Sequence, residues 1–315
     1  MSTPPWKPAV VTGTLVLAVG FMVGCGEQGP ANPSAEVRAV ATTTQLGDFA
    51  RQVGRDRVAV EQILESNADP HSYEPRPSDA ASIADADVVL RSGGDLDEWL
   101  GELIDNAGGD APVIELIDAV EPREGRDDED VDPHWWQDPR NAEKAVAAIR
   151  DELVEADPGG RQTYERNAAA YIDRLERLDS AVARCIDRIR PADRRLVTTH
   201  DALGYYADRY GLEVIGALIP SLSTQAQASS KDIGALVDQI DDLGVKAIFP
   251  ESSVNPELEE AVARETGAVV GEALWADTLG AEDSGGATYV GSIQSNTEAI
   301  ADGLTGGAVQ CRLGD

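Results

Sequence analysis

The chain has 315 residues, which is enough to bury a large core and more than one domain usually contains, so we expect two domains. Acidic residues number 57 against 26 lysines and arginines, which leaves a formal net charge of -31. Such a surface repels phosphate backbones, so we expect no nucleic-acid partner. An acidic exterior usually serves solubility, so this charge is little evidence for a cation site.

Residues 1–25 are predicted to be a lipoprotein signal peptide. Lys7 precedes an uncharged run over 8–24 with an apolar centre, and the run ends in small residues and Cys25. This order is typical of a bacterial secretion signal closed by a lipobox cysteine, which becomes the lipidated first residue after cleavage. The run is also long enough to be an uncleaved membrane anchor. Either way, the rest of the chain faces outward, and residues 26–36, which are small, polar and rich in Pro and Gly, are predicted to be a flexible tether.

Two further cysteines, Cys185 and Cys311, remain after the lipobox cysteine. In an oxidising compartment a single pair favours a disulfide, with two buried free thiols as the alternative. A bridge between them would tie the C-terminal tail to the helix that carries Cys185.

Strands and helices alternate through the first part of the chain. Apolar, β-branched runs predict strands at 37–43, 58–64, 87–90 and 113–117, with helices between them at 46–53, 77–84 and 95–104. This alternation predicts a parallel sheet with helices on its faces. The acidic run at 127–130 is predicted to be a solvated loop, with a metal-collecting lip as the alternative.

One long helix is predicted over 160–189. Its apolar positions, separated by three or four residues, are Tyr164, Ala168, Tyr171, Leu175, Leu178, Val182, Cys185 and Ile189. At about 1.5 Å per residue such a helix spans about 45 Å, enough to tie one lobe to another.

The alternation resumes beyond this helix. Strands are expected at 196–199, 213–217, 247–249 and 268–270, and helices up to 210, at 229–243, from 255 and at 287–303. We therefore expect an α/β fold of two Rossmann-like lobes with parallel sheets, joined by one long rigid helix. The first lobe covers 37–158, the linking helix 159–190 and the second lobe 191–315.

The chain contains three histidines, His71, His134 and His200, and each stands where a predicted strand gives way to a loop. Open α/β sheets bind ligands beyond the carboxyl ends of their strands. Two histidines come from the first lobe and one from the second, so a shared ligand would lie in the cleft between the lobes. Imidazole suits Zn²⁺ and is acceptable to Mn²⁺, and a four-coordinate site needs one more donor. Asp277, which follows a predicted strand of the second lobe, is the candidate.

Further carboxylates stand near these positions. Asp69, Asp132 and Asp201 are neighbours of the histidines and could accept a ring N–H. Glu251 follows another predicted strand and could line the cleft, with a ligand role as the alternative.

Four motifs in chain order carry a family resemblance. They are Asp-Pro-His-Ser-Tyr-Glu-Pro at 69–75, Asp-Pro-His-Trp-Trp-Gln-Asp-Pro at 132–139, Thr-Thr-His-Asp-Ala-Leu-Gly-Tyr at 198–205 and Leu-Trp-Ala-Asp-Thr-Leu at 274–279. Over essentially the whole mature chain, the sequence resembles the ZnuA/TroA type of metal-binding lipoprotein of bacterial ABC importers. The resemblance implies a buried metal between two lobes, held at the positions of His71, His134, His200 and Asp277. It also implies delivery of the metal to a membrane permease powered by a cytoplasmic ATPase.

The metal expected from this resemblance is Zn²⁺, with Mn²⁺ as the alternative. Many zinc-specific members carry a long histidine-rich loop before the second ligand, and this chain has a short acidic segment there. Members that resemble manganese carriers, however, often have Glu at the third ligand position, where this chain has His200.

We expect a binding protein and not an enzyme. Three histidines with an open fourth position could activate a water in a secreted zinc hydrolase, but Asp277 would close that position. The sequence contains no HExxH helix and no nucleophile elbow. A lipid-anchored adhesin of the same fold is a further alternative. The expected protein is a monomer at the extracytoplasmic face of the cell membrane, anchored by a lipid on Cys25.

Overall fold

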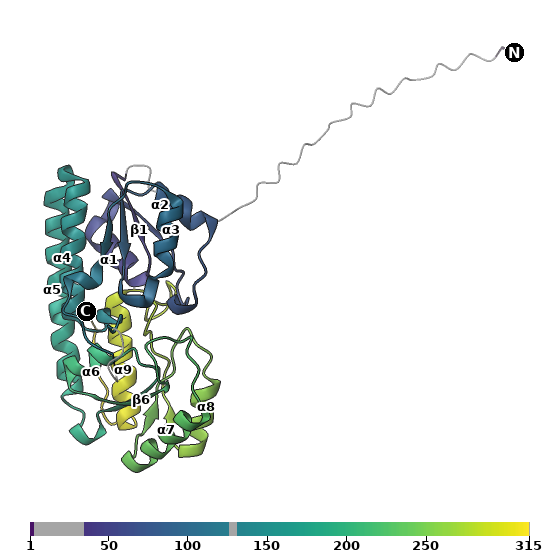
Figure 1. Cartoon of the computed structure of the whole chain (residues 1–315), viewed down its shortest axis with the longest axis vertical. Helices are drawn as coiled ribbons and strands as arrows, with labels where there is room; N and C mark the ends of the chain where they lie inside the picture. Colours follow the sequence, from purple (N-terminus) through teal and green to yellow (C-terminus); the bar gives the residue numbers. More distant parts are fainter. Residues whose placement is uncertain (3–34, 126–130, 315) are drawn as a thin grey trace. The chain divides into compact units, whose positions relative to one another are not determined.

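The computed structural model of the chain describes residues 1–2, 35–125 and 131–314 (Figure 1). Residues 3–25 of the predicted signal peptide with Cys25, most of the tether at 26–36 and all of the acidic run at 127–130 lie outside the described residues. Among the helices that are described, none is both long enough and apolar enough to cross a membrane.

The first lobe contains a parallel four-stranded sheet in the order β2-β1-β3-β4. Its strands are β1 (Val37–Ala41), β2 (Val58–Gln62), β3 (Val88–Arg91) and β4 (Val113–Glu115). In register, Val37 pairs with Val58 and Ala39 with Val88. The chain moves to one side of β1 to form β2 and then crosses to the other side for β3, so the direction of winding reverses between β1 and β3.

Helices cover both faces of this sheet, and alternate side chains along β1 pack against different helices. Ala39 and Ala41 belong to the core that includes α1 (Thr44–Gly54), whereas Val40 packs in a separate cluster with residues of α2 (Pro77–Ala84) and α3 (Trp99–Ala107). Successive strand residues point to opposite faces, so the sheet is covered on both sides.

The second lobe repeats the same strand order. Its strands are β5 (Arg195–His200), β6 (Glu213–Ile219), β7 (Ala247–Ile248) and β8 (Val269–Val270). The pairs β5-β6 and β7-β8 are parallel, and a parallel bridge between Thr198 and Phe249 joins them into the order β6-β5-β7-β8. The helices α6 (Gly204–Tyr210), α7 (Ser230–Leu243) and α8 (Glu257–Thr266) follow β5, β6 and β7.

The predicted linking helix is α5 (Arg161–Ile186), which contacts α1 of the first lobe and α6 and α9 (Tyr289–Thr305) of the second. Figure 1 shows α5 beside α4 (Pro139–Ala156), and the two helices pack along each other. The predicted α/β class, with two parallel-sheet lobes joined by one long helix, is confirmed. The helix α4 was not expected from the sequence. Its buried face includes Ala142, Ala145, Val146, Ile149 and Leu153.

The two lobes share apolar packing as well as this helix. The largest buried cluster contains side chains of both, from Val37 and Phe49 of the first lobe to Leu196 and Phe249 of the second. Both lobes belong to one compact unit of the chain. The disulfide expected between Cys185 and Cys311 is present, with the two Cα atoms 5.9 Å apart.

Candidate metal centre

The four residues predicted to bind a metal lie together. One ligand atom from each of His71, His134, His200 and Asp277 can be chosen so that all four lie within 4.8 Å of one another. The side chains of His134, His200 and Asp277 are fully buried, and that of His71 is 6% exposed.

Local structure explains how the four side chains meet. His200 ends β5, Asp277 follows β8, and His71 lies in a short 3-10 turn, η2 (Pro70–Ser72), that comes after β2. His134 directly precedes η6 (Trp135–Gln137), downstream of β4. The carboxyl ends of parallel strands share one edge of a sheet, which is where open α/β folds place their ligands.

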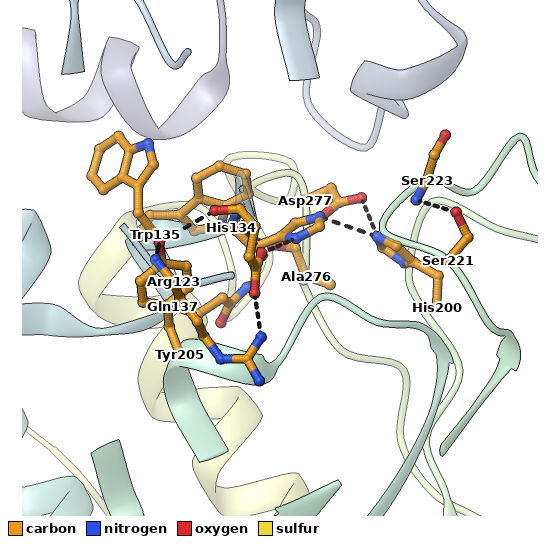
Figure 2. A network of polar contacts seen from close by, with 12 residues as sticks. Arg123, His134, Trp135, Gln137, His200, Tyr205, Ser221, Ser223, Ala276 and Asp277 are labelled. Atoms are coloured by element: carbon orange, nitrogen blue, oxygen red, sulfur yellow. Dashed lines mark hydrogen bonds and ion pairs between the residues drawn. The ribbon is translucent and has the colours of Figure 1, made fainter. Parts of the chain in front are cut away.

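The spacing of the donor atoms suits a single ion. The Nε2 atoms of His134 and His200 are 3.2 Å apart. Asp277 Oδ2 lies 3.3 Å from both His71 Nε2 and His200 Nε2, and Oδ1 lies 3.4 Å from His134 Nε2. Figure 2 shows Asp277 with the rings of His134 and His200. Bonds of about 2.0–2.1 Å arranged as a tetrahedron separate ligand atoms by about 3.3–3.4 Å, so these distances match the edges of a zinc site.

Three of these donor atoms lack a hydrogen bond. Both carboxylate oxygens of Asp277 and the Nε2 atom of His71 are buried without a hydrogen-bond partner in the described part of the chain. Buried polar atoms are nearly always hydrogen-bonded, because leaving them unsatisfied costs free energy. A divalent cation among them would satisfy all three atoms at once, so the donor set fits a metal.

A carboxylate orients the ring of His134. Asp132 Oδ1 lies 2.8 Å from His134 Nδ1 and also accepts the backbone N–H of His134 at 3.0 Å. A carboxylate only accepts, so Nδ1 carries the hydrogen and Nε2 presents its lone pair to the centre. Arg123 Nη1 donates to the other oxygen of Asp132 at 3.0 Å. Gly204 permits this approach, because a Cβ there would lie 2.4 Å from Arg123 Nη1.

A second carboxylate orients the ring of His200. Glu251 Oε1 lies 2.5 Å from His200 Nδ1 and accepts the backbone N–H of His200 at 3.1 Å. Burial opposes a charged imidazolium, but the negative charges of Glu251 and Asp277 outweigh it and raise the pKa of His200 to about 10. Burial would likewise raise the pKa of Asp277, yet the neighbouring histidines, His200 first, hold that pKa well below its ordinary value.

The loop that carries Asp277 is held from the first lobe. Trp136 Nε1 and Gln137 Nε2 both donate to the carbonyl oxygen of Ala276, at 2.9 Å and 2.6 Å. Figure 2 places Gln137 and Ala276 beside the two histidines. The residue before Asp277 is therefore fixed by two donors from the lobe that supplies His134.

The neighbouring carboxylates differ from one another in their contacts. Asp132 is confirmed as a ring partner, and Glu251 lies at the site, also as a ring partner. Asp69 instead accepts the backbone N–H of His71 at 2.9 Å and the hydroxyl of Thr224 at 2.8 Å. A ring contact of Asp201 stays a prediction. Sequence reasoning missed Gln137 and Thr224, whose partners lie far along the chain, and Arg123, which no local pattern marks as the partner of Asp132.

Comparison with known proteins identifies the family. The chain matches the family of zinc-uptake complex component A, periplasmic, over residues 39–303. It belongs to this family. The family is one of substrate-binding proteins of ABC importers, which are not enzymes.

Individual relatives extend over nearly the whole chain. The manganese-binding lipoprotein MntA of Halalkalibacterium halodurans is 31% identical over 92% of this chain and 96% of that protein. The iron ABC transporter substrate-binding lipoprotein MtsA of Streptococcus pyogenes is 26% identical over 95% of this chain and 98% of that protein. Among solved structures, the periplasmic zinc-binding protein TroA from Treponema pallidum superposes with a TM-score of 0.79 at 28% identity, covering 85% of this chain and 99% of that chain. These relatives are named for three different metals, so the likeness supports a divalent metal without selecting one.

Proposed function

We propose that this protein is the extracytoplasmic solute-binding component of a metal ABC importer that captures one Zn²⁺ ion. In this proposal His71, His134, His200 and Asp277 hold the ion, and the loaded protein delivers it to a membrane permease driven by a cytoplasmic ATPase. One observation carries the proposal: four residues, two from each lobe, bring one donor atom each to within 4.8 Å of the others in a buried place. A lipid on Cys25 would keep the monomer at the outer face of the cell membrane.

The donor set favours zinc over manganese. Three of the four donors are imidazole nitrogens and one is a carboxylate, whereas Mn²⁺ prefers oxygen ligands and higher coordination. The order of divalent affinities also places Zn²⁺ above Mn²⁺ at most sites. The support for zinc comes from these donor atoms and not from family membership. The relatives include a manganese-binding lipoprotein and a substrate-binding lipoprotein of an iron transporter.

The domain organisation proposed for this function has a first lobe at 37–158, a linking segment at 159–190 and a second lobe at 191–315. Each lobe carries its own parallel sheet, and α5 lies in the linking segment. The first lobe would supply two of the ligands and the second lobe the other two, so binding would be sensitive to the separation of the lobes.

A competitive titration tests the proposal. Zn²⁺ and Mn²⁺ are titrated into the purified protein against chelators of known affinity, with Asp277→Asn as the test variant. Asp283→Asn is the matched control, since it makes the same change at an exposed position six residues away. We expect one tightly bound Zn²⁺, weaker Mn²⁺, a large loss in Asp277→Asn and parental binding in Asp283→Asn. Absence of stoichiometric zinc, or parental affinity in Asp277→Asn, would overturn the proposal.

A further inference from the structure

The four donors of the metal centre are not held equally. His134 and His200 are each backed by a carboxylate at Nδ1, from Asp132 and Glu251 respectively, and both rings are fully buried. The ring of His71 has no such carboxylate behind it within the described part of the chain, and its side chain retains a 6% exposed fraction. His71 is therefore the ligand whose ring can leave the centre with the least loss of other contacts.

The side chain of His71 also reaches a cavity next to the metal centre. It lines a cavity of about 670 Å³ together with Tyr73, Trp99 and Ser223, and the exposed residues Asp95 and Glu98 lie at the same cavity. The cavity thus connects the edge of the metal centre with the surface. Its two exposed carboxylates would draw a cation toward the entrance.

Two contacts from the second lobe hold the turn that carries His71. Thr224 Oγ1 donates to Asp69 Oδ2 at 2.8 Å, while Asp69 Oδ1 accepts the backbone N–H of His71 at 2.9 Å. Gln225 Nε2 donates to the carbonyl oxygen of His71. Thr224 and Gln225 lie in the loop between β6 and α7, so both contacts join the two lobes beside the cavity.

We propose that Thr224 and Gln225 form an interlobe latch that sets the rate at which His71 releases the ion, and that the adjoining cavity is the path the ion takes. This inference rests on the proposed function, because it assumes that His71 is a metal ligand. Breaking the two bonds frees the turn of His71 while Asp132 and Glu251 continue to hold His134 and His200. Thr224 and Gln225 are positioning residues, since they act on the ion through Asp69 and the backbone of His71.

The test measures the rate of zinc release from the full-length protein in detergent. Zn²⁺-loaded parent, Thr224→Val and the double variant Thr224→Val/Gln225→Ala are mixed with an excess of a chromophoric chelator, at several chelator concentrations. Loss of a hydrogen bond to a charged group changes an equilibrium or rate constant about tenfold. We therefore expect zinc release to be about tenfold faster in Thr224→Val and faster again in the double variant. Gln227→Ala is the matched control, because it makes the same change as Gln225→Ala at an exposed position two residues further along the same loop, outside the cavity lining.

Two further measurements separate a latch from general damage. The Co²⁺-loaded double variant should keep the visible spectrum of the parent, since all four donors remain, and with chelator present it should still unfold in a single cooperative thermal transition. Parental release rates in the double variant, or equal acceleration in Gln227→Ala, would overturn the latch. If the parent bound no stoichiometric Zn²⁺, the proposed function would fail instead, so the two failures are distinguishable.

Discussion

Zinc binding should release close to one proton from His200 at pH 8. The carboxylates of Glu251 and Asp277 raise the pKa of this buried ring to about 10, so in the metal-free protein it is about 99% protonated at pH 8. A histidine with the ordinary value of about 6.5 would be only about 3% protonated at that pH. Zinc requires a neutral ligand nitrogen, so the proton on Nε2 must leave when the ion binds.

The sign of the pH dependence follows from the raised pKa. Protons compete with the ion at all pH values below about 10, so zinc affinity should keep rising with pH above neutrality. One displaced proton changes the affinity about tenfold per pH unit, or about 1.4 kcal/mol, which amounts to about 2.7 kcal/mol between pH 7 and pH 9. An imidazole with an ordinary pKa would show almost no change over this range.

Calorimetry in buffers of different ionisation enthalpy measures the protons released per zinc bound. Glu251→Gln is the informative control, because it keeps an acceptor near His200 Nδ1 but removes the charge that contributes most to raising the pKa. Proton release at pH 8 should fall toward zero in that variant. Release of fewer than about 0.2 protons by the parent at pH 8 would refute the reasoning, since His200 would then have an ordinary pKa.

Three further outcomes are expected. In competitive titrations His200→Glu should narrow the preference for Zn²⁺ over Mn²⁺, whereas His200→Ala should weaken both ions by more than the roughly 10–100-fold expected for a residue behind a ligand. Replacing Cys185 and Cys311 by serine should lower the free energy of unfolding by about 2–4 kcal/mol in chemical denaturation, and an unchanged value would show that the bridge contributes nothing. Cys25→Ser should move the protein from the membrane to the soluble fraction; continued membrane association would make the apolar segment at 8–24 the anchor.

Much of the fold could be predicted from local patterns. Short β-branched runs and the three- and four-residue spacing on α5 depend only on neighbouring residues, which is why strands such as β1 and β3 and the helix α2 lie within a residue or two of the predicted ranges. The helix α4 was missed although Asp138 caps it and Pro139 opens it. Alanine supplies two of its buried positions, Ala142 and Ala145, and such small side chains make a weak apolar stripe.

The sequence by itself determined which residues could form the metal centre. The chain has three histidines, each at a strand exit or in the loop beyond one, so few other imidazole donors were available. The four motifs contain the same three histidines and Asp277. Only the tertiary structure decided how those residues are held. Asp69 and Asp132 were equivalent in the sequence, since each stands two residues before a histidine, yet Asp132 contacts a ring and Asp69 contacts a turn.

The physical reason is the distance along the chain between interacting groups. Glu251 reaches His200 across 51 residues, and Thr224 reaches Asp69 across 155. Such contacts depend on how two sheets and the helices around them pack, because neither partner alters the periodicity or the turn chemistry of its own segment. The candidate ligands were therefore readable from residue type and position, whereas the raised pKa of His200 depends on how the second lobe folds and the hold on His71 exists only once the two lobes are brought together.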